Sequence, residues 1–214
     1  ENAAHELQTP LAVCMNKLEL LSEHPDCTED QLKEIAGLHQ ALNGIIRLNK
    51  SLLLLSRIDN KQFPETRDIC LNHLIHKILE GINDIYERKA LHLRVSEKES
   101  LVCTMNESLA TTLITNLIKN AYVHNYEKGD IGITISRRML TIANTGIDKT
   151  LDKELLFARF ASQVWGISSE GKTEEELAKA GLGLAIVKSI VDLYSIRIDY
   201  QYANGMHTFT LLFY

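Results

Sequence analysis

Apolar side chains recur at alternating intervals of three and four residues through much of the first quarter of the chain. They form two runs, which are Leu7, Leu11, Cys14, Leu18 and Leu21, and then Ile35, Leu38, Leu42, Ile45 and Leu52. This spacing is typical of helices that pack lengthwise against other helices. Pro25 separates the runs, and Thr28 with Gln31 has the form of a capping box. The sequence therefore predicts helices over residues 1–23 and 28–57, joined as an antiparallel hairpin.

The second helix carries a further apolar row, which includes Ile46 and Leu53 and widens its apolar surface beyond what one partner helix covers. Two copies of the hairpin would bury both rows in a four-helix bundle across a two-fold axis. We therefore expect a homodimer formed through residues 1–57. The first apolar row of this helix, from Ile35 to Leu52, is its predicted apolar seam, and Asn49 lies on it. Asn49 is either a polar residue that sets the helix register or a bundle-end residue that faces water.

Helix and strand patterns alternate from residue 67 onward, after a predicted linker over residues 58–66 that contains Pro64. Helices are expected over residues 72–87, 107–124 and 182–194, and strands over residues 91–95, 101–105, 131–136, 139–143, 196–202 and 207–213. Asn204-Gly205, between the last two strands, is a strong signal for a hairpin turn. Helices mixed with antiparallel strands predict the α+β class, with a two-layer α/β sandwich after the helical hairpin.

The composition of the 214 residues excludes several classes of protein. The net charge of −5 and the lack of a basic stripe argue against a nucleic-acid partner. The cysteines contain no Cys-x-x-Cys pair, which favours reduced thiols over a disulfide or zinc site. No apolar run reaches the ~20 residues of a membrane-spanning helix, and the chain opens in what the pattern predicts to be mid-helix. We therefore expect any sensor or membrane anchor to lie outside these residues.

A histidine with neighbours suited to phosphoryl transfer lies in the segment Ala4-His5-Glu6-Leu7-Gln8-Thr9-Pro10-Leu11. Neutral imidazole can attack a phosphoryl group, and Glu6 could accept a proton or stabilise the developing charge. Thr9 follows His5 by one helical turn on the same face. Pro10 removes an N–H from the helix and bends it there. A surface histidine beside a helix start at Thr9-Pro10 would give the same pattern, so this segment alone leaves both interpretations open.

Three later segments carry features of a nucleotide site. Asn116 and Asn120 lie one turn apart on a predicted helix, and amide oxygens are suitable ligands for Mg²⁺. Gly181-Leu182-Gly183 opens a helix, where free N–H groups favour phosphate. Asn144 and Gly146 lie where a strand runs into a turn. Each segment also has an ordinary interpretation. In the order given, these are a solvated helix face, a helix packing contact and a strand-end turn.

In this order, the segments resemble the catalytic core of the sensor histidine kinases of two-component systems, and the resemblance covers nearly the whole chain. The segment around His5 is similar to the H-box His-Glu-Leu-Arg-Thr-Pro-Leu, with Gln8 where Arg is usual. The other similar segments are the N-box at residues 116–121, the G1 block at 140–147, the F-box at 156–160 and the G2 block at 180–186. The resemblance implies a dimerisation and histidine phosphotransfer hairpin over residues 1–57. It implies a catalytic domain with the Bergerat-type ATP-binding fold of gyrase and Hsp90 over residues 67–214.

The resemblance also implies roles for particular residues. His5 would be the phosphoacceptor, Glu6 the general base and Thr9 a residue that serves removal of the phosphoryl group. ATP and Mg²⁺ would be the cofactors, with Asn120 as the metal ligand. The nucleotide-binding residues would be Asn116, Asn120, His124, Asn144, Gly146, Phe160, Lys179, Gly181 and Gly183.

Several residues depart from the family's pattern. Val123 lies where many members have Lys, Ser162 replaces a basic residue, and Lys179 replaces a frequent Gly. Asn144 stands where an Asp accepts a hydrogen bond from the adenine amino group. Its amide oxygen can still accept, but the uncharged bond should be weaker by about 1 kcal/mol.

The function that the resemblance implies is that of an ATP-dependent protein-histidine kinase in two-component signal transduction. It would autophosphorylate His5 and pass the phosphoryl group to an aspartate on the receiver domain of a response regulator. The expected setting is the cytoplasmic domain of a membrane-bound bacterial sensor. Two alternatives stay open, which are a nucleotide-binding scaffold with weak catalysis and a sensor in which phosphatase activity dominates.

Overall fold

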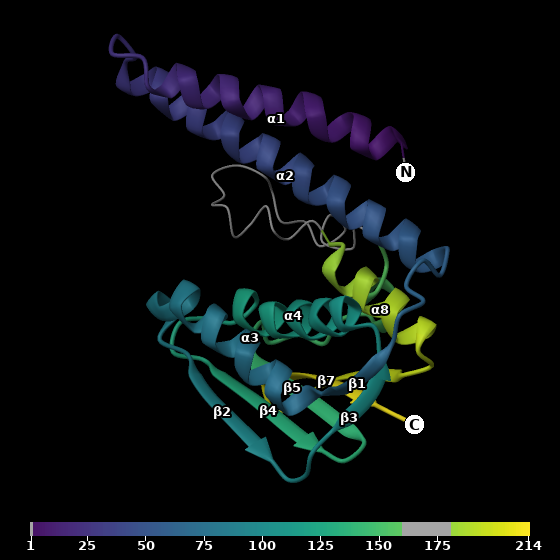
Figure 1. Ribbon diagram of the computed structural model, residues 1–214. Coiled ribbons are helices and arrows are strands. Elements are labelled where there is room, and N and C mark those ends of the chain that lie inside the picture. Colours follow the sequence, from purple (N-terminus) through teal and green to yellow (C-terminus); the bar gives the residue numbers. More distant parts are fainter. Residues whose placement is uncertain (1, 160–180) are drawn as a thin grey trace.

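The structure is a computed structural model that describes residues 2–159 and 181–214, with side chains described from Thr9 onward. A long two-helix hairpin lies at one end of the molecule, and a sandwich of helices and sheet forms the rest (Figure 1). Among the described residues, no helix combines the length and the apolar composition that crossing a membrane requires.

The hairpin consists of α1 (Asn2–Ser22) and α2 (Glu29–Asp59), which run antiparallel as expected. The predicted capping box is confirmed at the start of α2. The Gln31 N–H donates to the Thr28 hydroxyl at 3.3 Å, and the Thr28 N–H donates to Gln31 Oε1 at 2.9 Å. These two bonds satisfy N–H groups that have no partner within the helix, so they define where α2 begins.

Helix α2 ends two residues later than expected, because its last turns belong to the core of the sandwich. Leu55 and Ile58 are buried in the same apolar cluster as the start of α8 (Gly183–Leu193). An ion pair of 3.0 Å between Asp59 and Arg159 joins the end of α2 to the segment that follows α5 (Lys153–Leu156). Within the described residues, the hairpin therefore rests on the sandwich through apolar packing and this exposed ion pair.

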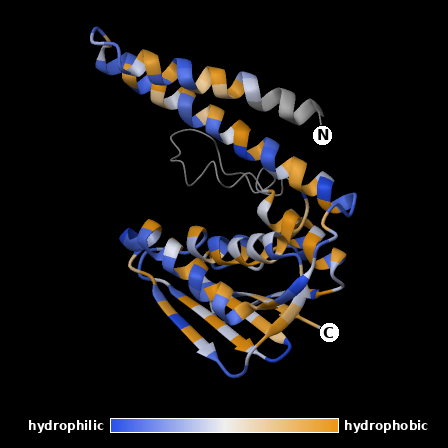
Figure 2. Ribbon diagram, in the orientation of Figure 1, coloured by the Kyte–Doolittle hydropathy of each residue, from blue (hydrophilic) through white to orange (hydrophobic). Residues whose placement is uncertain are grey.

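Much of the predicted apolar seam of α2 is exposed in the part of the chain that the structure describes. Leu38, Ile45 and Leu52 are 55%, 48% and 38% exposed. Figure 2 shows apolar residues distributed along both helices of the hairpin. A single copy of the hairpin therefore leaves uncovered apolar surface of the kind that other helices cover in bundles.

A five-stranded sheet forms one layer of the sandwich, with strand order β2-β4-β5-β7-β6. The strands are β2 (His92–Glu97), β4 (Asp130–Ser136), β5 (Met139–Thr145), β6 (Arg197–Ala203) and β7 (Met206–Leu212). The hairpin turn predicted at Asn204-Gly205 is confirmed, with φ angles of 51° and 75°. The sheet is mixed rather than purely antiparallel, since β2 runs parallel to β4. The chain between these two strands contains a helix that crosses over the sheet, and such a connection produces parallel neighbours.

Among the described elements, helices cover one face of this sheet (Figure 1). They are α3 (Leu71–Tyr86), α4 (Glu107–Val123) and α8, and a short 3₁₀ helix, η1 (Glu87–Lys89), follows α3. Alternate residues of β4, namely Ile131, Ile133 and Ile135, are buried beneath the helices. The predicted helical hairpin followed by a two-layer sandwich is therefore the observed architecture.

A second sheet of two strands, β1 (Arg67–Cys70) and β3 (Val102–Met105), lies beside α3. We expected β3 from its pattern but not β1. Only Ile69 of the four β1 residues is buried, so this strand has no alternating pattern to detect. Its pairing with a strand more than thirty residues away stabilises it instead.

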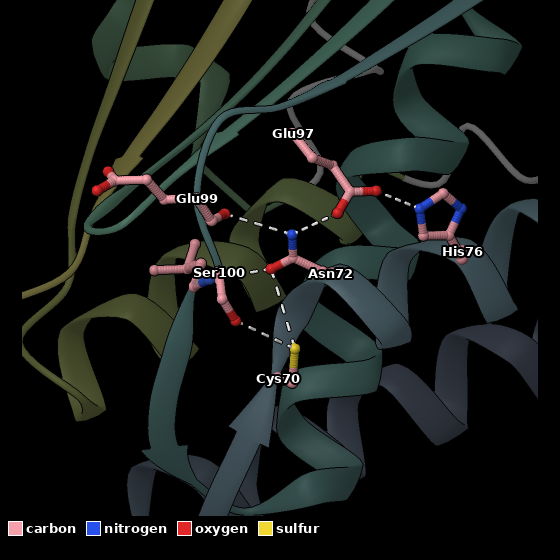
Figure 3. Close-up of polar contacts among 7 residues, drawn as sticks. Cys70, Asn72, His76, Glu97, Glu99 and Ser100 are labelled. Carbon is pink, nitrogen blue, oxygen red and sulfur yellow. Dashed lines mark hydrogen bonds and ion pairs between the residues drawn. The ribbon is translucent and has the colours of Figure 1, made fainter.

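Polar side chains tie the loop between β2 and β3 to the start of α3 (Figure 3). The buried Asn72 donates to Glu97 at 2.6 Å, and its amide oxygen accepts from the Leu101 N–H at 2.9 Å. The other oxygen of Glu97 pairs with His76. The hydrogen bond from Asn72, followed by that from His76, lowers the pKa of Glu97. These contacts hold β3 in register beside β1.

Candidate active site

Helix α4 meets the start of α8 at one point along its length and the turn after β5 at its end. A Cβ atom built on Gly183 would lie 2.9 Å from Asn116 Oδ1. A Cβ atom built on Gly146 would lie 3.0 Å from the carbonyl oxygen of His124 and 3.0 Å from Cδ2 of His207. These separations leave no free space for a larger side chain at either glycine. Four of the predicted site residues are therefore brought together in two pairs, Asn116 with Gly183 and His124 with Gly146, from segments that are far apart in the sequence.

The two predicted amide ligands share one face of α4. Asn116 Nδ2 donates to the Thr112 carbonyl oxygen at 2.8 Å, which orients its Oδ1 atom toward Gly183. Asn120 is half-buried one turn later, and its carbonyl oxygen accepts from the His124 N–H at 3.0 Å as the helix ends. Amide oxygens suit Mg²⁺, which binds few protein ligands and completes its shell with water and phosphate oxygens. The donor set therefore fits Mg²⁺ held jointly with a nucleotide.

The part of the chain that the structure describes gives less support for a binding site for a metal other than Mg²⁺. There, no group of three or more His, Cys, Asp or Glu side chains is arranged to hold an ion. All four cysteines, Cys14, Cys27, Cys70 and Cys103, are free thiols, as the sequence predicts. Burial is the main cause that raises the pKa of Cys103 to about 11, so this thiol stays protonated and is a poor metal ligand.

The sequence patterns did not reveal Lys89, which supports the end of α4. Lys89 Nζ donates to the carbonyl oxygens of Tyr122 and Val123 at 3.0 Å each, and to that of Asn125 at 3.3 Å. The carbonyl groups at a helix end carry partial negative charge, so an ammonium group there stabilises the helix. Lys89 thereby fixes the turn that carries His124, from a position more than thirty residues earlier.

Asn144 is 2% exposed near the end of β5, and its Nδ2 atom donates to the Thr145 carbonyl oxygen at 2.7 Å. A carbonyl oxygen only accepts hydrogen bonds, so this contact requires the nitrogen of the amide and turns Oδ1 away. The Thr145 hydroxyl donates to Asn125 Oδ1 at 2.6 Å and accepts from the Asp130 N–H at 2.9 Å. The end of β5 is therefore tied to the loop that follows α4.

We expect Asn144→Asp to lower the free energy of unfolding by about 1–3 kcal/mol. A carboxylate would place an oxygen 2.7 Å from the Thr145 carbonyl oxygen, where the amide now donates a hydrogen bond. The loss should shrink at low pH, because a protonated carboxyl group can donate again. Urea unfolding of this variant and of Asn204→Asp, the same exchange in an exposed turn, measures the effect. An equal change in both variants would show that the Thr145 contact has no such influence.

The remaining predicted residues divide between α1, the approach to α8 and the undescribed segment. His5, Glu6 and Thr9 lie on α1, where His5 and Thr9 are one helical turn apart and Thr9 is exposed. Gly181 precedes α8 with a φ angle of 67°, a conformation that favours glycine. Two predicted contacts, Phe160 and Lys179, fall outside the described residues, as does Ser162.

The family comparisons place this arrangement, a helical hairpin followed by a sandwich in which Asn116 of α4 meets Gly183 of α8, in the class of nucleotide-binding kinase cores. Residues 105–213 match the histidine kinase-, DNA gyrase B-, and HSP90-like ATPase family, and residues 1–61 match the His Kinase A (phospho-acceptor) domain. The chain therefore belongs to this ATPase family, as a sensor histidine kinase of the two-component type.

Individual relatives agree with this assignment. The chain is 31% identical over 218 residues to the heme sensor protein HssS of Staphylococcus saprophyticus, a match that covers 100% of the chain and 45% of HssS. It is 27% identical over 217 residues to the sensor histidine kinase HprS of Escherichia coli, covering 99% of the chain and 46% of HprS. The chain thus spans less than half the length of these relatives.

A solved structure supports the fold alone. The histidine kinase AdeS of Acinetobacter baumannii superimposes with a TM-score of 0.65 at 20% sequence identity, covering 97% of this chain and 95% of that one. The predicted fold class is therefore confirmed, whereas the predicted family is confirmed by the family matches given above.

Proposed function

We propose that the chain is the catalytic core of an ATP-dependent protein-histidine kinase. It autophosphorylates His5 and passes the phosphoryl group to an aspartate of a response-regulator receiver domain. Residues 1–57 serve as the dimerisation and phosphotransfer domain, residues 58–66 as a linker and residues 67–214 as the ATP-binding domain. The observation that carries the proposal is the contact between the Asn116 amide oxygen and Gly183, since it joins the amide-bearing helix to a glycine-rich helix start.

ATP binds between α4, the turn after β5 and the start of α8. Free N–H groups at the start of α8 hold phosphate oxygens, as helix N-termini commonly do. Asn144 Oδ1, turned away from Thr145, accepts a hydrogen bond from the adenine amino group, and Gly146 forms the turn beside the base, packed closely against His124 and His207. Asn120 supplies an oxygen to Mg²⁺, which when bound neutralises charge on the phosphates. The other predicted nucleotide contacts are Asn116, His124, Phe160, Lys179, Gly181 and Gly183.

The phosphoryl group moves in line from ATP to the imidazole of His5. A nitrogen–phosphorus bond forms while the bond from the γ-phosphorus to the bridging oxygen breaks, and ADP leaves with that electron pair. Glu6 accepts the ring proton or stabilises the charge that develops on the ring. Thr9, which is exposed one turn later, positions a water molecule for removal of the phosphoryl group. Catalysis rests mainly on positioning and on neutralisation of charge.

The chain acts as a homodimer. The exposed seam of Leu38, Ile45 and Leu52 supports this, because a second hairpin would cover it in a four-helix bundle. A receiver domain docks on this bundle near His5. More than half the length of HssS and HprS lies outside the match, which leaves room in such proteins for sensing and anchoring segments. We propose that this chain likewise forms the cytoplasmic part of a membrane-anchored bacterial sensor.

Incubation of the purified chain with Mg²⁺ and ATP labelled in the γ-phosphate tests the kinase function. We expect protein-bound label that is lost in acid and kept in base, and none from ATP labelled in the α-phosphate. Binding of ATP without any label would favour the weakly catalytic scaffold instead. A sensor dominated by phosphatase activity would dephosphorylate a receiver domain rapidly, and Thr9→Ala would abolish that reaction.

A further inference from the structure

The β6–β7 hairpin holds the segment after β5 at three points. This segment, residues 147–151, leads from Gly146 toward α5. Each contact joins one aromatic side chain of the hairpin to one residue of the segment. The three pairs are His207 with Ile147, Tyr200 with Leu151, and Tyr202 with Asp148. The segment beyond the turn at Gly146 is therefore attached along most of its length.

His207 lies at the centre of these contacts and is 5% exposed. Its Nε2 atom lies 2.8 Å from the Ile147 carbonyl oxygen, so Nε2 carries the proton and donates it. In the neutral ring Nδ1 then accepts, and the Tyr200 hydroxyl donates to it at 2.8 Å. The same hydroxyl accepts from the Leu151 N–H at 3.2 Å. A continuous chain of hydrogen bonds thus runs from Leu151 to Ile147 through two buried side chains.

The ring of His207 also packs against the turn itself. It stacks with Tyr200 at 6.1 Å between ring centroids and lies 4.8 Å from the ring centroid of Tyr202. A Cβ atom on Gly146 would come within 3.0 Å of His207 Cδ2. In the sheet, His207 is the direct partner of Asn144 across β5 and β7. His207 therefore contacts or adjoins both residues that we assign to the adenine base.

We propose that His207 is a positioning residue for the nucleotide, an inference that rests on the proposed function. It fixes the Gly146–Ile147 turn so that Asn144 and Gly146 meet the base in a prearranged geometry. It acts through the Ile147 backbone and takes no part in the transfer of the phosphoryl group. Loss of its hydrogen bonds should therefore weaken ATP binding, because binding must then order the turn, and should leave the rate at saturating ATP nearly unchanged.

Two substitutions separate hydrogen bonding from packing at this position. His207→Phe keeps an aromatic ring but removes both hydrogen bonds, whereas His207→Gln keeps one donor and one acceptor. We expect the Kd for ATP to rise about tenfold or more in His207→Phe and by less than about threefold in His207→Gln. The autophosphorylation rate at saturating ATP should stay within about twofold of wild type in both. Titration calorimetry and labelling of the full chain give these values.

Tyr194→Phe is the matched control, because the Tyr194 hydroxyl accepts from the Asn106 N–H at 3.0 Å, away from the turn. It should leave the Kd for ATP unchanged. If wild type and His207→Phe have equal Kd values for ATP, the positioning role is overturned. It is also overturned if His207→Phe and His207→Gln weaken ATP binding equally while both variants keep the melting temperature of wild type.

Tyr202→Phe gives a second test should either His207 variant fail to fold. It removes only the contact with Asp148, from a half-buried position, so the fold should survive. We expect the Kd for ATP to rise about threefold, and an unchanged Kd would count against the inference. Failure of the proposed function is recognised by a different result. A wild-type chain that binds no ATP would overturn both the kinase function and the positioning role of His207.

Discussion

The variant His5→Gln is expected to lose the label from γ-labelled ATP, with a fall of more than about 1,000-fold to background. Glutamine resembles histidine in size and polarity, but the lone pair of its amide nitrogen is delocalised and cannot attack phosphorus. Because the proposed ATP site lies in the sandwich, the Kd for ATP should be unchanged. Time courses of labelling, together with titration calorimetry, separate lost chemistry from lost binding.

His24→Gln is the matched control for this experiment. His24 is exposed in the turn between α1 and α2, so the same exchange alters a histidine of the hairpin without touching the proposed phosphoacceptor. We expect labelling within about twofold of wild type. An acid-labile label that persists in His5→Gln would mean that another histidine is the nucleophile.

The second large effect is expected for Asn120→Ala, which should slow autophosphorylation by about 100-fold or more. The substitution removes the amide oxygen that we assign to Mg²⁺, so the charge of the transferred phosphoryl group is less well neutralised. The rate should also need a higher Mg²⁺ concentration to reach half of its maximum. Labelling rates measured over a Mg²⁺ series give both values.

Lys119→Ala tests whether this effect is specific. Lys119 is the exposed neighbour of Asn120 on α4, so its loss perturbs the same turn of helix without changing the proposed metal ligand. Its rate and its Mg²⁺ dependence should match wild type. If Asn120→Ala kept the wild-type Mg²⁺ dependence, the assignment of Asn120 as the metal ligand would be wrong.

Local patterns in the sequence were sufficient for most elements of the fold. The spacing of Leu38, Ile45 and Leu52 indicated α2, and the Thr28–Gln31 capping box indicated where it begins. Asn204-Gly205 indicated the β6–β7 turn. These signals are readable because helix periodicity, capping and tight turns each involve residues within a few positions of one another.

The tertiary structure alone revealed the residues that support the site. Lys89 caps the end of α4 across more than thirty positions, and His207 reaches Ile147 across sixty. The parallel pairing of β2 with β4, and the strand β1, likewise depend on distant partners. The sequence pattern predicts for His207 only that it begins a strand, because nothing beside it in the chain indicates what its ring contacts.

The sequence by itself determined the order of most of the elements, the family and the residue types available for phosphoryl transfer, since all of these are written in short segments. Only the tertiary structure decided which side chains meet. It brought Asn116 to Gly183, and it turned the Asn144 amide so that its nitrogen faces the Thr145 carbonyl. The physical reason is that such contacts depend on how helices and strands pack across the core, and packing joins residues that no local pattern connects.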